Sequence, residues 1–169
     1  RNRLGFGEKK VDILGYELDL ETGETYDKIK DCKSNPSRLI PHLYYYTKAR
    51  DEGVSGEWVK FNSLSGSWAC RFSYDEEDVN ALAKAFTSNK KKAAETLESF
   101  GATPADYGDL AYEIPFLPMV KVLLVFEEGD EEFPPSVRLL YDKNSIYYLP
   151  HEMLGNISWL LVSRVFAAV

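Results

Sequence analysis

Histidine is scarce in this sequence, and one of the two histidines lies among aromatic and aliphatic residues. The chain of 169 residues contains His42 and His151. A neutral imidazole nitrogen is a common ligand for the metal of a planar cofactor. The segment "LIPHLYYYT" places Leu39, His42 and Tyr46 on one side of a predicted helix. We therefore interpret His42 either as a hydrogen-bonded core residue or as an axial ligand.

Two tryptophans follow this helix on a segment that is predicted to form a hairpin. Trp58 and Trp68 could oppose the helix across an apolar, planar pocket, or they could fill the core. If the protein holds a cofactor, we expect His42, Tyr46, Trp58 and Trp68 to contact it. The class of cofactor that fits an apolar, planar pocket with one histidine is a metal tetrapyrrole, either a corrinoid or haem.

An acidic run offers a second candidate chemistry. Residues 126 to 135, "FEEGDEEFPP", contain enough carboxylates to bind Ca²⁺ or Mg²⁺, but their spacing differs from that of an EF-hand loop. A row of carboxylates between two strands is normally a solvated turn that also prevents edge-to-edge aggregation. We predict a hairpin turn here. The alternative is a small metal-dependent enzyme that uses the carboxylates of residues 127 to 132.

The remaining sequence contains no motif that dictates a reaction. The phosphate-binding glycine patterns, the G-x-S-x-G nucleophile pattern and the H-E-x-x-H zinc pattern are absent. Cys32 and Cys70 are too few for a disulfide framework or a four-thiolate cluster within this chain. We expect both as thiols, and a protein that is not an enzyme.

Charge and hydropathy restrict the partner and the compartment. A formal charge of −7 repels a phosphate backbone, so nucleic acid is not an expected partner. The longest apolar stretches are shorter than the roughly 20 residues that a membrane-spanning helix needs. The first residues show no secretion signal. We expect a cytoplasmic protein without a membrane partner.

The periodicity of apolar residues predicts one α+β domain over residues 1–169, with a mainly antiparallel sheet of hairpins and three or four packed helices. Alternation predicts an opening hairpin around a turn at Thr22–Glu24, a hairpin over 56–74, and a central strand within 112–128 that pairs with 136–142. Helical spacing predicts helices over 39–50 with a C-cap at Gly53, over 76–86, over 90–100 and from Pro150 onward.

The order of these segments resembles a prokaryotic domain family, typical of strict anaerobes, that is catalogued as a domain of unknown function. The resemblance covers Leu39 to Leu154, and its most specific pieces are "GEW" at 56–58, "GD" at 108–109, "GDEEFPP" at 129–135 and "YLPHE" at 148–152. Some members carry the domain after a four-cysteine iron–sulfur module. This chain lacks those cysteines, so it resembles either a stand-alone version or a part that follows such a module.

The resemblance implies a role in anaerobic metabolism. We expect a non-catalytic accessory domain that binds a metal tetrapyrrole, or that docks onto a protein partner in an anaerobic, cofactor-bearing complex. The alternatives are the metal-dependent enzyme described above and a purely structural interaction subunit.

Overall fold

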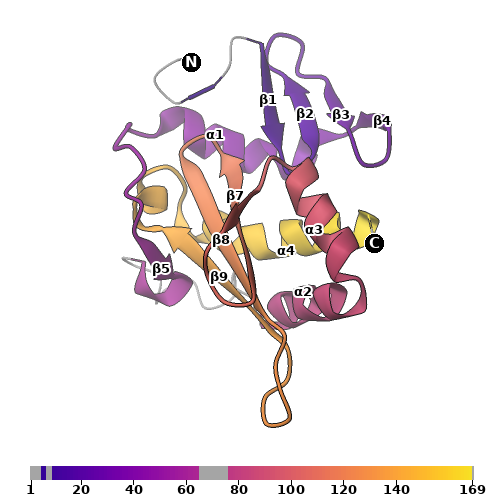
Figure 1. Cartoon of the computed structure of the whole chain (residues 1–169). Helices are drawn as coiled ribbons and strands as arrows, with labels where there is room; N and C mark the ends of the chain where they lie inside the picture. The colour runs from indigo at the N-terminus through magenta and orange to yellow at the C-terminus, as the bar shows by residue number, and fades with distance from the viewer. Residues whose placement is uncertain (1–4, 7–8, 65–75, 169) are drawn as a thin grey trace.

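The structure is a computed structural model that describes residues 5–6, 9–64 and 76–168 (Figure 1). Its strands form two antiparallel sheets. In spatial order, the four-stranded sheet contains β1 (Lys10–Ile13), β2 (Tyr16–Asp19), β3 (Thr25–Asp27) and β4 (Cys32–Ser34). The five-stranded sheet contains β5 (Trp58–Lys60), β9 (Ser136–Asp142), β8 (Val120–Glu127), β7 (Leu110–Leu117) and β6 (Thr103–Ala105). The α-helices are α1 (Ile40–Lys48), α2 (Glu76–Ser88), α3 (Lys90–Ser99) and α4 (His151–Ala168).

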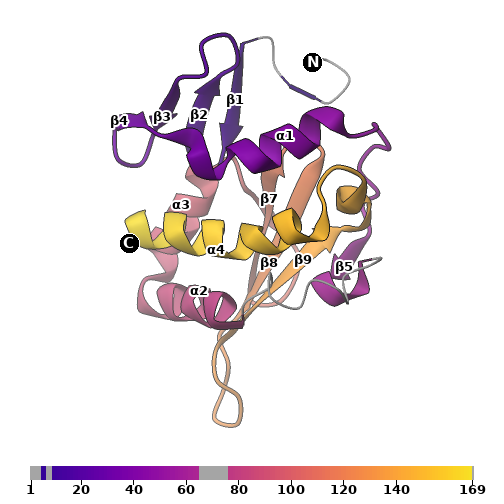
Figure 2. The same ribbon diagram turned by 180° about the vertical axis from the view of Figure 1, so that it is seen from behind.

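The helices collect on one side of the five-stranded sheet. Figures 1 and 2 show α4 crossing a face of that sheet, with α1 on one flank of α4 and α2 on the other. The four-stranded sheet lies at one end of the molecule, and the β8–β9 hairpin projects from the other. Two antiparallel sheets with packed helices confirm the predicted α+β class. In the described part of the chain, no helix is long and apolar enough to cross a bilayer.

The central strand β8 explains how the core forms. Its sequence is almost entirely apolar because both of its faces are covered. Val122 and Leu124 face the main core with the helices, whereas Leu123 and Val125 belong to a small cluster on the opposite face. The predicted single strand within 112–128 is in fact the end of β7 followed by β8, because the chain turns between Leu117 and Val120.

The N-terminal sheet contains one more turn than the sequence pattern predicted. Leu14 and Gly15 both have positive φ angles, 49° and 78°, and they join β1 to β2. A two-residue connection with both φ angles positive matches the right-handed twist of a hairpin. Leucine rarely adopts this conformation, which is why the sequence concealed the turn. Burial of the Leu14 side chain holds it in place.

One further prediction was wrong in detail. The helix over 39–50 ends at Lys48 with Ala49 as its C-cap, so Gly53 belongs to the following loop. In the part of the chain that the structure describes, the strand β5 pairs with β9. The second half of the hairpin predicted over 56–74 lies outside the described residues. The other helices agree with the prediction within a few residues.

A buried ion pair ties the N-terminal sheet to α4. The Arg164 guanidinium donates two hydrogen bonds of 2.7 Å to the Asp27 carboxylate, and its Nε donates to the Leu14 carbonyl at 2.9 Å. Burial works to raise the pKa of Asp27. Hydrogen bonds from Arg164 and from the backbone N–H groups of Lys30 and Ile29 outweigh burial, so the pKa is lowered. The carboxylate is therefore ionised in the folded protein at neutral pH.

Candidate functional site

His42 lies in the core between α1 and α4. Its side chain is 2% exposed, and its Nε2 atom lies 3.1 Å from the carbonyl oxygen of Met153. Because a carbonyl only accepts, this contact assigns the proton to Nε2. Burial lowers the pKa of His42, and hydrogen bonding to the backbone opposes that effect only in part. The imidazole is therefore neutral at neutral pH, and a planar cofactor could reach it only if α1 and α4 separated.

Tyr46 lies one turn further along α1 and is also fully buried. Its ring packs against Phe6 and Tyr148, with centroid distances of 5.1 and 5.7 Å. Its hydroxyl accepts a hydrogen bond of 3.0 Å from the backbone N–H of Met119. Burial raises the pKa of Tyr46, so the phenol stays neutral. Its position fastens α1 to the β7–β8 turn.

The two tryptophans do not join this pair. Trp58 packs with Ala111, Leu123 and Val125 in the cluster on the opposite face of the five-stranded sheet. The sheet therefore separates Trp58 from His42 and Tyr46. Trp68 and Cys70 lie outside the described residues. Contact of these four residues with a tetrapyrrole stays a prediction, and the structure brings only His42 and Tyr46 together.

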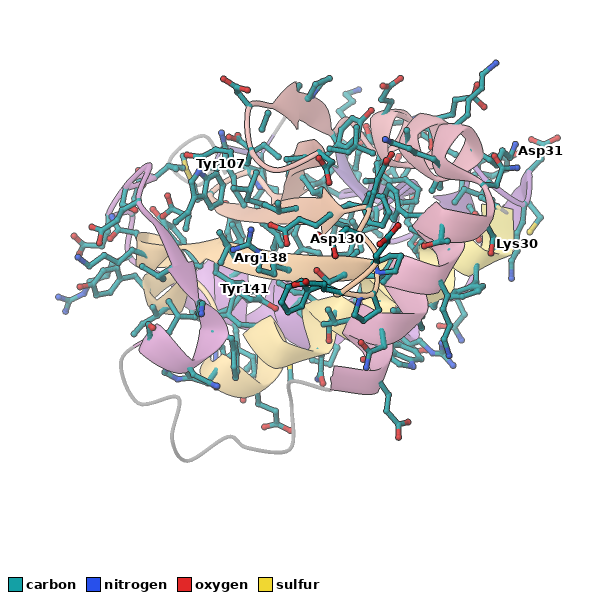
Figure 3. The ribbon with its side chains drawn as sticks, turned by 60° about the horizontal axis from the view of Figure 1, so that its bottom comes forward. Lys30, Asp31, Tyr107, Asp130, Arg138 and Tyr141 are labelled. Carbon is teal, nitrogen blue, oxygen red and sulfur yellow. The ribbon has the colours of Figure 1, made fainter. Side chains whose placement is uncertain are left out.

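The acidic run is the tip of the projecting β8–β9 hairpin, as predicted. Figure 3 looks toward this tip, with Asp130 and Arg138 near the centre and Tyr107 to one side. Asp130 accepts hydrogen bonds from the backbone N–H groups of Glu132 and Phe133 at 2.8 and 2.9 Å. These bonds lower the pKa of Asp130. The neighbouring Glu127 pairs with Arg138. Among the residues that the structure describes, no group of three His, Cys, Asp or Glu side chains is arranged to hold a metal ion.

Figure 2 shows α1 and α4 on the same side of the molecule, with α1 above α4. Exposed apolar side chains occupy both helices: Ile40, Tyr44 and Tyr45 on α1, and Trp159 and Phe166 on α4, all between 40% and 53% exposed. We call these five residues the α1–α4 surface. The rings of Tyr44 and Tyr45 pack edge-on with centroids 5.4 Å apart, and exposed aromatic residues are enriched at protein interfaces. The sequence prediction placed the tyrosine run in a pocket or in the core and therefore missed this surface.

Cations border the α1–α4 surface. Arg38 lies over the ring of Trp159, with its guanidinium carbon 4.4 Å from the centroid, and the Lys48 ammonium lies 3.8 Å from the centroid of Tyr44. From Lys33 to Arg50 the chain has four cations and no acidic residue. The charged residues of α4 are Glu152, at its first turn, and the buried Arg164. Lys33 pairs with Glu24 in the N-terminal sheet, so Arg38 and Lys48 are the cations that lie against these exposed rings.

Two of the quoted sequence motifs bind the loop between α1 and β5, "GEW" through the buried carboxylate of Asp142 and "YLPHE" through the hydroxyl of Tyr148. This carboxylate accepts hydrogen bonds from the backbone and hydroxyl of Ser55, from the Gly56 N–H at 2.7 Å, and from the Asn144 N–H at 2.9 Å. The Tyr148 hydroxyl binds the same loop, because it accepts from the Glu52 N–H at 2.9 Å. "GEW" and "YLPHE" therefore fix the loop between α1 and β5.

The other two motifs meet at the base of the hairpin. The Asp109 carboxylate accepts a hydrogen bond of 2.9 Å from the Glu128 N–H. Gly129 has a positive φ of 77°, and a Cβ there would lie 2.5 Å from the Phe133 carbonyl oxygen. Only glycine fits such a turn. These motifs therefore preserve the fold of the tip.

The comparisons with known proteins agree with the resemblance seen in the sequence. No curated protein and no solved structure matches the chain. One family matches residues 9–164, which is most of the chain. That match gives no support for a four-cysteine module in this chain, which has two cysteines. The chain belongs to the family described as "Domain of unknown function (DUF3786)".

Proposed function

We propose that this domain is a non-catalytic docking module, and that its α1–α4 surface binds an acidic region of a partner protein. The observation that carries the proposal is the set of exposed aromatic side chains bordered by Arg38 and Lys48. Tyrosine, tryptophan and arginine are the residues that most often dominate binding energy at interfaces. The partner therefore presents apolar groups among carboxylates.

The chemistry of the surface favours an acidic partner over a second copy of the chain. Two copies that meet through this surface would place Arg38 and Lys48 of both copies in one interface, and like charges that come together there cost several kcal/mol. An acidic partner gains from the same cations, which also speed its association. Apolar side chains of that partner would cover Tyr44 and Trp159.

The resemblance implies an accessory domain that either binds a tetrapyrrole or docks onto a partner protein, and the proposal chooses docking. We infer from the resemblance to a family of anaerobes that the partner is an enzyme or subunit that carries a corrinoid, haem or iron–sulfur cofactor. Direct binding of a tetrapyrrole at His42 would require α1 to separate from α4, since Nε2 of His42 contacts the Met153 carbonyl. The docking alternative needs no such opening.

A model peptide tests the chemistry of the surface without a known partner. The probe is a fluorescein-labelled helical peptide with leucine on one face and glutamate elsewhere, and the control probe has lysine in place of glutamate. We expect the acidic peptide to bind, as measured by fluorescence anisotropy, with an affinity that falls as salt is added. The lysine peptide should bind far more weakly. Equal binding of both probes would contradict the proposal.

Matched variants locate the binding surface. Tyr44→Ala should weaken binding of the acidic peptide about tenfold, the typical effect of truncating an interface aromatic residue. Tyr107→Ala is the control, because Tyr107 is 50% exposed, close to the 53% of Tyr44, but lies near the hairpin. Lys48→Glu should also weaken binding, whereas Lys91→Glu on α3 should not. A loss with Tyr107→Ala as large as that with Tyr44→Ala would place the interface elsewhere.

A further inference from the structure

A pocket of about 480 Å³ lies at the seam between the two sheets. Figure 1 shows β1 above the end of β7, with α3 beside them. The apolar part of the wall comes from Val11, Phe100, Pro115, Leu117 and Pro118. This volume lies within the usual range of small-molecule sites. The pocket shares no residue with the α1–α4 surface.

The free edge of β1 forms one polar side of this pocket. Among the residues that the structure describes, β1 is at the edge of its sheet and pairs only with β2. A two-residue turn joins Ile13 to Tyr16, so these two residues form a hydrogen-bonded pair. Hydrogen-bonded and non-hydrogen-bonded pairs then alternate along β1 and β2 away from the turn. Lys10 and Asp12 therefore direct their backbone N–H and C=O groups away from β2. Both residues line the pocket, so its wall offers paired donors and acceptors.

Side-chain charges divide between the two sides of the pocket. Lys10 and Lys28 stand on the side of the N-terminal sheet, and Glu98 stands at the end of α3. The C-terminus of a helix also carries partial negative charge, which favours a cation beside Glu98. Lys28 pairs with Asp12, and Lys10 pairs with Glu17. These pairs are partly solvent-exposed and individually weak, so a ligand carboxylate can compete with them.

Two glycines in the wall leave space where other residues would place a side chain. A Cβ on Gly15 would lie 3.1 Å from both the Arg164 guanidinium and the Phe100 ring, so glycine keeps this wall thin. A Cβ on Gly101 would meet only Pro115, at 3.8 Å. The buried pair of Arg164 and Asp27 fixes the turn behind the pocket. A site that is held in this way loses little entropy when it binds a ligand.

We propose that the seam pocket binds a zwitterionic α-amino acid with an apolar side chain. The ligand carboxylate lies toward Lys28 and the β1 backbone N–H groups, and the ligand ammonium lies toward Glu98 and the end of α3. The apolar side chain packs on Phe100 and the prolines. This site is independent of the proposed docking function, and either can fail without the other.

Isothermal titration calorimetry with L-phenylalanine and three analogues tests the proposal. We expect L-phenylalanine to bind, and both 3-phenylpropionate and 2-phenylethylamine to bind about tenfold or more weakly, because each lacks one charge. N-acetyl-phenylalaninamide, which lacks both charges, should bind weakest. The proposal is overturned by no detectable heat with L-phenylalanine at millimolar concentration, or by equal binding of a singly charged analogue. Tighter binding of the amide would indicate an extended peptide along β1 and would also overturn it.

Two conservative variants test the assigned contacts. Glu98→Gln should weaken L-phenylalanine about tenfold and leave 3-phenylpropionate unchanged, since only the amino acid carries an ammonium. Lys28→Met should weaken both carboxylate ligands. The controls are Glu131→Gln at the hairpin tip and Lys91→Met on α3, with circular dichroism as the check of folding. Equal losses in the controls, or no selective effect of Glu98→Gln, would contradict the assigned orientation.

Discussion

His42 could serve either as a core residue or as a cofactor ligand. The sequence left His42 either as a hydrogen-bonded core residue or as an axial ligand, and the register of α1 turns His42 toward Met153 and away from solvent. Periodicity predicted the buried side of this helix correctly, because Leu39, His42 and Tyr46 are all buried. It could not predict what lies opposite, since that depends on α4, more than a hundred residues later.

Truncating His42 should therefore lower stability. His42→Ala removes a buried ring and its hydrogen bond to Met153, so we expect a loss of about 1 to 3 kcal/mol in the free energy of unfolding measured by urea denaturation. Tyr44→Ala, on the exposed side of the same helix, should change it by less than about 0.5 kcal/mol. Titration with haem or a corrinoid under reducing conditions tests the ligand role. An absorption band that His42→Ala shifts and Tyr44→Ala does not would support ligation by His42.

We predict that the buried ion pair of Asp27 and Arg164 makes the free energy of unfolding depend on pH. Removing one partner of a buried ion pair typically costs about 3 to 5 kcal/mol, and Asp27→Asn should show such a loss at pH 7. Because the folded pKa of Asp27 is lowered, its contribution is complete above the unfolded value of about 3.9 and is lost as pH falls toward the folded value.

Urea unfolding of the wild-type protein and of Asp27→Asn, at neutral pH and at a series of acid pH values, measures this contribution. The difference between the two proteins should shrink as pH falls below about 4. The double variant Asp27→Leu with Arg164→Met should recover much of the loss, because an apolar pair leaves no buried charge unpaired. A difference that stays constant down to low pH would contradict the role of the Asp27 charge.

Among the elements, the projecting β8–β9 hairpin was the most predictable. The acidic run, Gly129 and the double proline marked a solvated turn, and the structure has that turn. The pairing of β5 with β9 was less predictable, since nothing local in "EWVK" specifies a partner strand so far along the chain. The Leu14–Gly15 turn was hidden because tertiary burial of Leu14 overrides its conformational preference.

The hairpin tip should respond unequally to loss of its carboxylates. Replacing both Glu131 and Glu132 by Ser should change the free energy of unfolding by less than about 0.5 kcal/mol, because both side chains are exposed. Asp130→Ala should cost more, since its carboxylate accepts two backbone hydrogen bonds that shape the tip. Thermal unfolding of the three proteins makes the comparison. A larger loss from the glutamates than from Asp130 would show that they have contacts beyond a solvated turn.

At the scale of the whole molecule, composition gave the net charge but not how the charge is distributed over the surface. A net charge of −7 excludes a uniformly basic surface, but it does not show that Arg38 and Lys48 lie against exposed aromatic side chains. That arrangement appears only when α1 and α4 lie on the same side of the molecule (Figure 2). The fold class and most helices therefore follow from local periodicity, whereas the α1–α4 surface and the seam pocket follow from contacts between distant segments.

Site-specific photo-crosslinking in the source cells tests the docking account most directly. A benzophenone amino acid is placed at Tyr44 or Trp159 on the α1–α4 surface, and at Tyr107 or Phe133 as exposed aromatic controls. We predict that positions 44 and 159 crosslink to one shared protein, through a segment rich in Asp and Glu, and that adding Lys48→Glu removes the crosslink. The account is contradicted if positions 107 and 133 capture that protein while 44 and 159 do not, or if the crosslinked segment is basic.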